Sequence, residues 1–352
     1  MKTIFIGGFG AGNLGDDLIL ASMLDIDASA TVVAYGPPLT ERRIEYIAFD
    51  TFFRNAHAIL GTHERVVLGG GGIFWSQEHI YELLVIALIA KGLGMRVELR
   101  RVGLHGFHYG MDASRHLLRV ADVVTLREHD SLDLACRLLG CPTATFEPDY
   151  ACARLSASPP PRNARPRVGV NIASTRFIDD PSFSNHLQQI YAHLAHRYHD
   201  VADFHYIPFC SHMSSHNQND FAKADLLFAA SEGRIKCRSV TTTVERLITE
   251  CATMDLFLGE RFHMHTIARM LGRPFIPFIH NEQTKYRALT LEYGDAPVYY
   301  ELSQAMIIDQ LADRLDAAIS SALTSQHRAA PTITEFLQHD PPAADQYLPA
   351  SH

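Results

Sequence analysis

Residues 155–166 read LSASPPPRNARP, and this stretch divides the chain into two parts of similar length. Three consecutive prolines can neither continue a helix nor donate hydrogen bonds to a sheet. The remaining residues are mostly small or polar, which is typical of a linker. The stretch predicts a first domain over residues 1–155, a linker at 156–166, a second domain over 167–325 and a tail at 326–352.

Strand-like and helix-like stretches alternate on both sides of this linker. Before it, apolar β-rich runs are separated by helical patterns such as Asp16–Leu24, Glu78–Lys91 and Ser131–Leu139; the runs are Lys2–Gly7, Ala30–Tyr35, Arg65–Leu68, Arg96–Val102 and Asp122–Leu126. After it, the alternation runs from Arg167–Ile172 to a closing helix at Gln304–Leu323. Such alternation indicates parallel βαβ units with helices on both faces of a sheet. The sequence therefore predicts an α/β protein with two Rossmann-like domains facing each other across a cleft, a GT-B-like fold.

The composition argues against several classes of protein. Of 352 residues, 47% are hydrophobic and 20% charged, and the formal net charge is −8 at pH 7. A nucleic-acid-binding protein normally carries a basic face, so no nucleic-acid partner is expected. The N-terminus reads as a strand and not as a signal peptide. No apolar run approaches the ~20 residues of a transmembrane helix, so we expect a cytoplasmic protein; the sequence leaves its oligomeric state open.

Three glycines, Gly10, Gly12 and Gly15, match the dinucleotide pattern GxGxxG between a strand and a helix. Two features argue against NAD. The acid that would bind a ribose about 20 residues further on is missing, because the second strand ends there without one. Asp16 and Asp17 would also repel a pyrophosphate at the helix N-terminus. No nicotinamide cofactor is therefore expected.

The stretch Asn13–Asp17 allows two interpretations. It either forms a tight turn and a helix cap, or it contacts a sugar hydroxyl at the carboxyl edge of the sheet. Ligands bind at that edge in open α/β folds. The second interpretation makes Asn13 and Asp16 candidates for acceptor binding or for the lining of the cleft.

A run of four glycines, residues 69–72, follows the strand-like stretch RVVL. A single turn needs fewer glycines, and the exposed N–H groups of such a loop can bind an anion. Gly70, Gly71 and Gly72 are therefore candidate donor-binding residues. His79 lies about one turn inside the helix that follows, and we place it on the cleft side as a candidate catalytic residue.

The stretch GERFHMH at 259–265 also follows a strand-like run and opens a helix. Arg261 and His263 are two residues apart, so in an extended segment they would point the same way. Together they could hold a phosphate and transfer a proton. Glu260, beside them, is a further candidate for the cleft. His265 could form a metal pair with His263, but no third ligand at a suitable spacing is apparent, so no metal is expected.

Cationic residues follow strand-like runs in both halves. Arg127 does so in the first half, where it could also form a salt bridge or cap with Glu128. Arg176 occupies the matching place in the second half, and Lys285 follows the run Phe275–Ile279. Several cations at one edge of an acidic protein indicate a small anionic substrate.

Five stretches, in this order along the chain, resemble the polysaccharide pyruvyl transferase family. They are GAGNLGDDLIL at 10–20, LGGGGIF at 68–74, TLREHDS at 125–131, EPD at 147–149 and ERFHMHTIARMLGRP at 260–274. The first and last of these signatures together are specific for the family. Two stretches depart from its usual forms, namely VGLHGFHYG at 102–110 and IHNEQTK at 279–285. These departures leave the acceptor open.

The resemblance implies a GT-B-like fold, phosphoenolpyruvate as the donor, a pair of sugar hydroxyls as the acceptor, and no cofactor. It implies donor-binding roles for Arg261 and His263, and it extends to Arg127 and His79. Ketal formation requires a proton for the enol carbon, which a histidine can supply, and arginine forks for the carboxylate and phosphate. A lipid-linked acceptor is one of the alternatives, and it would bring the protein to the inner face of the membrane.

Two other functions remain open at this point. The first is a GT-B glycosyltransferase that uses a nucleotide sugar, with Glu260 at the ribose. The second is a non-catalytic binding protein on the same scaffold. A donor-binding assay that compares phosphoenolpyruvate with nucleotide sugars tests the first. The absence of turnover with any acceptor would indicate the second.

Overall fold

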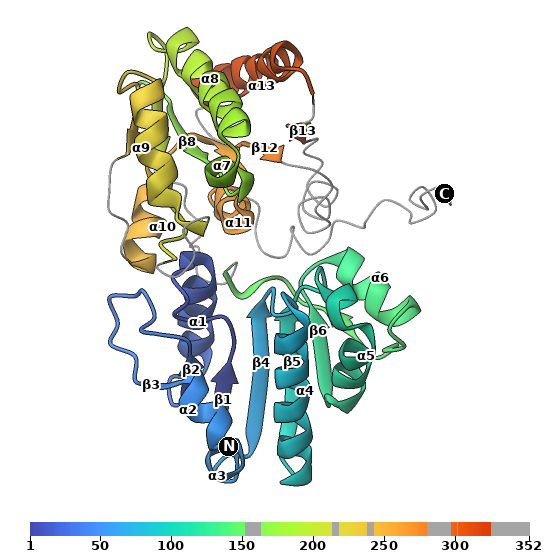
Figure 1. Ribbon diagram of the computed structural model, residues 1–352. Helices are drawn as coiled ribbons and strands as arrows, with labels where there is room; N and C mark the ends of the chain where they lie inside the picture. The colour runs from blue at the N-terminus through green and yellow to red at the C-terminus, as the bar shows by residue number, and fades with distance from the viewer. Residues whose placement is uncertain (152–162, 213–217, 238–242, 280–296, 301, 325–352) are drawn as a thin grey trace.

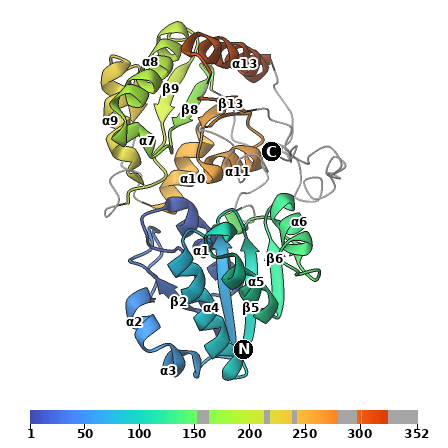
Figure 2. The same ribbon diagram turned by 45° about the vertical axis from the view of Figure 1, so that its right-hand side comes forward.

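The computed structural model describes residues 1–151, 163–212, 218–237, 243–279, 297–300 and 302–324. The predicted tail therefore lies outside the described residues, as do residues 156–162 of the predicted linker and Lys285. Figure 1 shows two α/β halves, one above the other, and Figure 2 shows the same arrangement after a rotation of 45°.

The first half is built on a seven-stranded sheet in the order β3-β2-β1-β4-β5-β6-β7, in which every paired strand is parallel. Its strands are β1 (Thr3–Ile6), β2 (Thr31–Ala34), β3 (Tyr46–Ala48), β4 (Arg65–Gly71), β5 (Arg96–Val102), β6 (Val123–Leu126) and β7 (Thr145–Phe146). Its helices are α1 (Leu14–Ile26), α2 (Phe49–Arg54), α3 (Ala56–Leu60), α4 (Gln77–Gly92), α5 (Met111–Val120) and α6 (His129–Arg137).

The second half is built on a six-stranded sheet in the order β10-β9-β8-β11-β12-β13, again with parallel pairing throughout. Its strands are β8 (Arg167–Asn171), β9 (Asp203–Tyr206), β10 (Ile235–Cys237), β11 (Leu256–Gly259), β12 (Phe275–Ile279) and β13 (Val298–Tyr299). Its helices are α7 (Arg176–Asp179), α8 (Pro181–Arg197), α9 (Asp220–Ala230), α10 (Val244–Ala252), α11 (Phe262–Met270) and α13 (Gln304–Thr324).

These two sheets confirm the predicted pair of Rossmann-like halves. In each sheet the strand order reverses at one point, between β1 and β4 in the first and between β8 and β11 in the second. In open α/β sheets, ligands bind at the carboxyl ends of the strands at such switch points. The fold therefore directs attention to the loops that follow β1, β4, β8 and β11.

An apolar cluster joins the two halves. Leu14 and Leu18 of α1 pack with Phe209, Met254 and Met264 from the second half, and all five are at most 1% exposed. At ~25 cal/mol per Å² of buried apolar surface, such a cluster stabilises the junction considerably. Both views show α1 reaching up to α10.

Backbone hydrogen bonds hold the same junction in register. The N–H of Leu14 donates to the carbonyl of Phe209 at 2.9 Å, and the N–H of Ser211 donates to that of Gly12 at 2.8 Å. Gly12 has a φ of +87°, which favours glycine. The start of α1 is thus tied directly to the segment that follows β9.

Within the described residues, no helix is both long and apolar enough to span a membrane.

Candidate active site

Arg127 lies at the carboxyl end of β6 and makes contacts with both halves of the molecule. Its Nε donates to Glu128 at 2.6 Å and its Nη1 to Asp149 at 2.7 Å. Its guanidinium also lies 4.1 Å from the centroid of the Phe262 ring at the start of α11, within the range of a cation–π contact. The guanidinium is buried, and the neighbouring carboxylates raise its pKa against the effect of burial. The predicted salt bridge with Glu128 is therefore present, and a second carboxylate accompanies it.

Asp149 connects Arg127 to a histidine of the other half. Its Oδ2 accepts from Arg127 and lies 3.8 Å from Nε2 of His263. Burial disfavours the ionised form of Asp149, but His263 and Arg127 outweigh it and hold the pKa of this carboxyl well below its usual range. Asp149 is therefore ionised at neutral pH and can orient the imidazole ring. A line of three ionisable side chains thus crosses the junction.

His263 reaches this position because Gly15 has no side chain. A Cβ on Gly15 would lie 2.6 Å from Cγ of His263 and would overlap Nδ1. The two ring nitrogens therefore face different surroundings, with Nε2 on the side of Asp149 and Nδ1 against the first turn of α1. His263 itself is 7% exposed.

The glycine loop after β4 lies against the same cluster. Gly70 and Gly71 have positive φ values of 50° and 86°, which only glycine adopts easily. The Cβ position of Gly71 is 3.0 Å from Oδ1 of Asp16, and that of Gly72 is 3.9 Å from Nη2 of Arg127. The structure thus brings the predicted glycines, Asp16 and Arg127 together at the switch point of the first sheet.

Asn13 and the two aspartates after it have different roles. The side chain of Asn13 caps α1 by accepting from Gly15 N, and its Nδ2 donates to Asp16 Oδ2 at 2.8 Å. Asp17 is fully buried and accepts from the N–H groups of Gly10 and Leu39. Burial raises the pKa of Asp17 to about 7, although these two hydrogen bonds lower it. Asp17 is a structural residue, whereas Asp16 faces the glycine loop.

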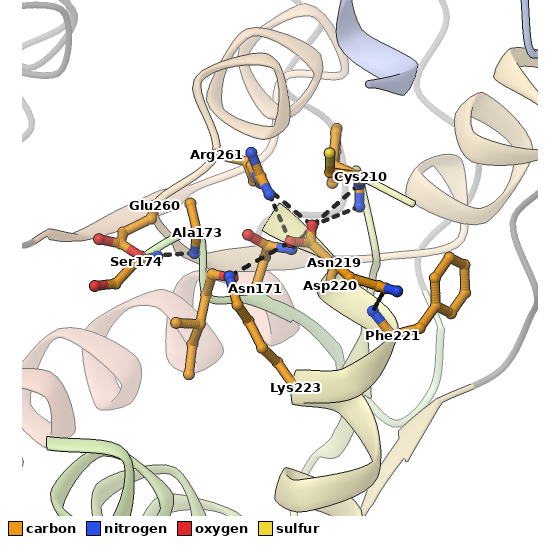
Figure 3. A network of polar contacts seen from close by, with 12 residues as sticks. Asn171, Ala173, Ser174, Cys210, Asn219, Asp220, Phe221, Lys223, Glu260 and Arg261 are labelled. Atoms are coloured by element: carbon orange, nitrogen blue, oxygen red, sulfur yellow. Dashed lines mark hydrogen bonds and ion pairs between the residues drawn. The ribbon is translucent and has the colours of Figure 1, made fainter. Parts of the chain in front are cut away.

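Arg261 and Glu260 lie at the switch point of the second sheet, shown in Figure 3. Arg261 forms a two-pronged contact with buried Asp220, and the shorter bond, from Nη2, is 2.5 Å. Glu260 accepts from the backbone N–H groups of Ala173 and Ser174, both at 2.6 Å. The carboxylate of Glu260 therefore already binds the amides that would otherwise be offered to an anion after β8.

Arg261 and His263 reach different acids, Asp220 and Asp149, although both belong to the GERFHMH stretch. Helix α11 begins at Phe262 and Arg261 is its N-cap, so the two-residue period of an extended segment does not apply between them. The helical turn directs His263 toward the first half while Arg261 reaches Asp220. His265, the other member of the possible metal pair, is buried and stacks on the ring of Phe275 at 4.3 Å.

Arg176 lies further out. It begins α7, is about half exposed, lies 3.6 Å from Asp180 and covers the ring of Phe183 at 4.3 Å. These contacts tie it to the start of α8. The structure does not bring it to the line formed by Arg127, Asp149 and His263.

His79 lies in an aromatic cluster at the ends of β2 and β4. Its ring stacks on Trp75 with centroids 3.7 Å apart and an angle of 8°, and its Nδ1 lies 3.2 Å from the hydroxyl of Tyr35 and 3.1 Å from Glu82. Burial lowers the pKa of His79 to about 4. His79 is therefore neutral near pH 7, a state that suits hydrogen bonding more than acid catalysis. The contacts of its ring are with aromatic side chains and Glu82, and they do not include Arg127, Asp149 or His263.

Trp75 connects this aromatic cluster to Asp16. The Cβ position of Gly8 is 3.7 Å from Cζ3 of Trp75 and 3.4 Å from Oδ2 of Asp16. The indole is 44% exposed. An open aromatic ring and the carboxylate that borders the glycine loop thus both lie beside Gly8.

Within the described residues, no group of three His, Cys, Asp or Glu side chains is arranged to hold a metal ion.

A family model of polysaccharide pyruvyl transferases matches residues 13–282. The chain belongs to the polysaccharide pyruvyl transferase family. The match covers α1, the glycine loop, Arg127, Asp149 and His263, so the residues that meet at the junction all lie inside the family region. No curated protein sequence matches the chain.

Solved structures similar to this family member are GT-B enzymes, which confirms the predicted fold class. Staphylococcus aureus MnaA with UDP is 9% identical, with a TM-score of 0.59 over 93% of this chain and 92% of that one. A putative UDP-N-acetylglucosamine 2-epimerase from Listeria monocytogenes is 11% identical, with a TM-score of 0.58 over 94% and 92%. Anabaena HepE with UDP-glucose is 11% identical, with a TM-score of 0.57 over 96% and 98%. At these identities the likeness concerns the fold alone.

The sequence patterns assign no role to three residues of the site. These are Asp149, which stands inside the EPD stretch, Asp220 and Trp75. The sequence signal for Asp149 is its place just after a strand end, like Arg127. Asp220 offers a weaker signal, an acid three residues before Lys223 on a mostly apolar helix.

Proposed function

We propose that this protein transfers a pyruvyl group from phosphoenolpyruvate to hydroxyls of a saccharide and forms a pyruvate ketal. The observation that carries the proposal is the line of contacts from Arg127 through Asp149 to His263. This line spans both halves beside the glycine loop. Membership in the family supports the transfer of a pyruvyl group to a polysaccharide or a related glycoconjugate. The geometry supports the donor because a fixed guanidinium, loop amides and a histidine suit a compact carboxylate-phosphate.

In this proposal the donor lies between the glycine loop and Arg127. Nε and Nη1 of Arg127 are bound to carboxylates, so Nη2, on the side of Gly72, is the group directed to the donor. The amides of Gly71 and Gly72 add neutral donors. Arg261 supplies a second guanidinium from the opposite half.

The reaction requires an acid and two hydroxyl groups. His263 gives a proton to C3 of the enol, and the first sugar hydroxyl forms a bond to C2. The C2–O bond to phosphate then breaks and the second hydroxyl closes the ketal. One hydroxyl proton restores His263, and the other goes to the departing phosphate, which leaves as hydrogen phosphate. Asp149 holds the imidazole throughout, and no covalent intermediate with the enzyme is needed.

We place the saccharide acceptor against Trp75. Its exposed indole offers an apolar face to a sugar ring, and Asp16, which also lies beside Gly8, can accept a hydrogen bond from a hydroxyl. The ring of His79 stacks on the indole, and Glu82 in turn contacts His79. The acceptor on the Trp75 indole and the donor at Arg127 are then neighbours, as a transfer between two substrates requires.

The alternative donor is a nucleotide sugar, since MnaA binds UDP and HepE binds UDP-glucose in the structures named above. The position of Glu260 disfavours this donor. Its carboxylate accepts from the amides of Ala173 and Ser174 and would repel a diphosphate there.

The experiment is a product analysis. The purified protein is incubated with phosphoenolpyruvate and a panel of glycosides that includes polymer, lipid-linked and nucleotide-linked sugars, and phosphate release and product mass are followed. A phosphoenolpyruvate-dependent gain of one pyruvate ketal, accompanied by phosphate release, supports the proposal. Turnover of a UDP-sugar, with no use of phosphoenolpyruvate, contradicts it.

A further inference from the structure

Asp220, the first residue of α9, is the centre of a buried polar network (Figure 3). It is 0% exposed. Its carboxylate accepts from Arg261, from the backbone N–H groups of Phe209 and Cys210, and from Nδ2 of Asn171. An unpaired carboxylate would be very costly at such a depth, so these donors account for its presence.

The two oxygens of Asp220 have different neighbours. Oδ2 accepts from Phe209 N at 2.9 Å, Cys210 N at 3.2 Å and Asn171 Nδ2 at 3.2 Å. It also accepts a hydrogen bond from Nε of Arg261 at 3.2 Å. Oδ1 accepts from Nη2 of Arg261 at 2.5 Å and lies 3.7 Å from Nζ of Lys223. Oδ2 thus holds the backbone and one nitrogen of Arg261, whereas Oδ1 faces only the two cations among these partners.

The backbone that Asp220 holds is the segment that joins the halves. Phe209 accepts from Leu14 N, and Cys210 forms an antiparallel bridge with Asn13 at the start of α1. Asp220 therefore fixes Arg261 relative to α1. The first turn of α1 in turn contacts His263 through Gly15.

Lys223 supports Asp220 from the helix side. It is completely buried, and its Nζ donates to the carbonyl of Ile172 at 3.2 Å. Burial lowers the pKa of Lys223, and the charge of Asp220 opposes this shift. Nζ of Lys223 lies 3.7 Å from Oδ1 of Asp220, so a second cation accompanies Arg261 at this oxygen.

We propose that Asp220, backed by Lys223, is a positioning residue that holds the guanidinium of Arg261 in the orientation needed to bind an anionic donor. The proposal rests on the proposed function insofar as the donor is phosphoenolpyruvate. The held orientation itself is a property of the free protein. A guanidinium whose orientation is fixed in advance loses less freedom on binding than a mobile one, and this favours affinity for the donor.

Asp220→Asn is the variant that separates the two oxygens. Its remaining oxygen can keep the place of Oδ2 on the amides of Phe209 and Cys210, while the NH₂ group replaces Oδ1 opposite Arg261 and Lys223. The matched control is Asp203→Asn, an acid of the same half that pairs with Lys236 at 3.6 Å on the surface. Asp220→Asn should raise KM for phosphoenolpyruvate about tenfold, as loss of a charge-assisted bond does, while kcat and the acceptor KM stay within about threefold; Asp203→Asn should change none of them.

A double-mutant cycle with Arg261→Lys tests whether Asp220 acts through Arg261. If it does, Asp220→Asn has little further effect in the Arg261→Lys background, because the fork is already lost. A residue that serves only the fold would lower activity equally in both backgrounds. Equal effects in the two backgrounds would overturn the proposal.

A second readout needs neither donor nor turnover. In NMR spectra of ¹⁵N-labelled full-length protein, the guanidinium of Arg261, assigned by its loss in Arg261→Lys, should show restricted rotation in the wild type and free rotation in Asp220→Asn. Free rotation in the wild type overturns the positioning role even if Asp220→Asn fails to fold. Restricted rotation together with no use of phosphoenolpyruvate would leave the positioning role intact and count against the proposed function.

Discussion

Gly15 and His263 come from opposite halves of the chain, and the absence of a side chain at Gly15 makes room for the imidazole of His263. A Cβ at Gly15 would lie 2.6 Å from Cγ of His263 and 2.7 Å from Cε1. Gly15 stands in the first turn of α1 with a backbone that alanine adopts without strain. The glycine is therefore required by the neighbouring ring and not by its own conformation.

This relationship predicts a selective loss of activity in Gly15→Ala. The methyl group must displace the imidazole from its place between α1 and Asp149, and a displacement of about 1 Å at a reacting group costs roughly 10²-fold in rate. Turnover with phosphoenolpyruvate and the melting temperature are measured together. The matched control is Gly92→Ala in α4, where a Cβ meets no atom within 4 Å. Activity of Gly15→Ala equal to that of Gly92→Ala would show that the position of His263 is irrelevant to turnover.

Removal of the imidazole tests the acid itself. His263→Ala should lower kcat by roughly 10²–10⁴-fold, the usual contribution of a positioned acid, and should change donor affinity much less. His263→Gln can still donate a hydrogen bond, so it should retain donor binding without proton transfer. Pre-steady-state phosphate release and equilibrium binding of phosphoenolpyruvate separate the two effects. A folded His263→Ala enzyme with wild-type turnover and pH profile is incompatible with this role.

The fold was predictable because its signal is local. Buried parallel strands such as β4 and β8 are short apolar runs, and each is followed by a helical pattern, so the alternation alone indicates βαβ units. The edge strands β3, β7, β10 and β13 have only two or three residues each. Runs of that length show no periodic pattern of apolar residues, so these strands cannot be predicted from the sequence.

The contacts of the site were only partly predictable. The position of Arg127, Asp16 and the glycine loop follows from one rule, that the strands of a parallel sheet end at the same edge. The pairing of Asp149 with His263 and of Asp220 with Arg261 joins residues far apart in the chain, and no local pattern encodes it. The expected cooperation of Arg261 with His263 assumed an extended segment, whereas the helix begins between them.

The aromatic face predicts an effect on the acceptor alone. Trp75→Ala should raise the acceptor KM about tenfold, because a stacked ring pair contributes on the order of 1 kcal/mol beyond the area it buries. The KM for phosphoenolpyruvate should remain within about twofold. Tyr81→Ala is the control, since Tyr81 is an exposed aromatic residue on α4 that lies outside this cluster. Equal effects of the two substitutions would place the acceptor elsewhere.

Metal removal should leave the enzyme active. We expect full turnover after dialysis against EDTA, because arginine side chains and backbone amides supply the positive charge that a phosphate requires. The measurement is phosphate release before and after chelation, with Mg²⁺, Mn²⁺ and Zn²⁺ added back one at a time. Activity lost with EDTA and restored by one of these ions would contradict the prediction.

His79 predicts how stability depends on pH. Burial lowers its pKa to about 4 in the folded protein, whereas a histidine in the unfolded chain has a pKa of about 6.5. Between these values the unfolded chain binds a proton that the folded protein does not bind. The contribution of His79 is therefore fully present above about pH 6.5 and is lost as the pH falls toward 4. At about 1.4 kcal/mol per pKa unit, the loss is on the order of 3 kcal/mol.

The variant that isolates this contribution is His79→Phe, which keeps a flat ring against Trp75 and cannot titrate. The free energy of unfolding is measured by urea denaturation at several pH values between 4 and 7.5 for both proteins. The wild type should lose stability relative to His79→Phe as the pH falls, because acid favours the unfolded state only where the histidine is present. Asp17, whose raised pKa acts over an overlapping range, is unchanged in both proteins and cancels in the difference. A constant difference across the range would mean that His79 titrates normally and is not shielded by the aromatic cluster.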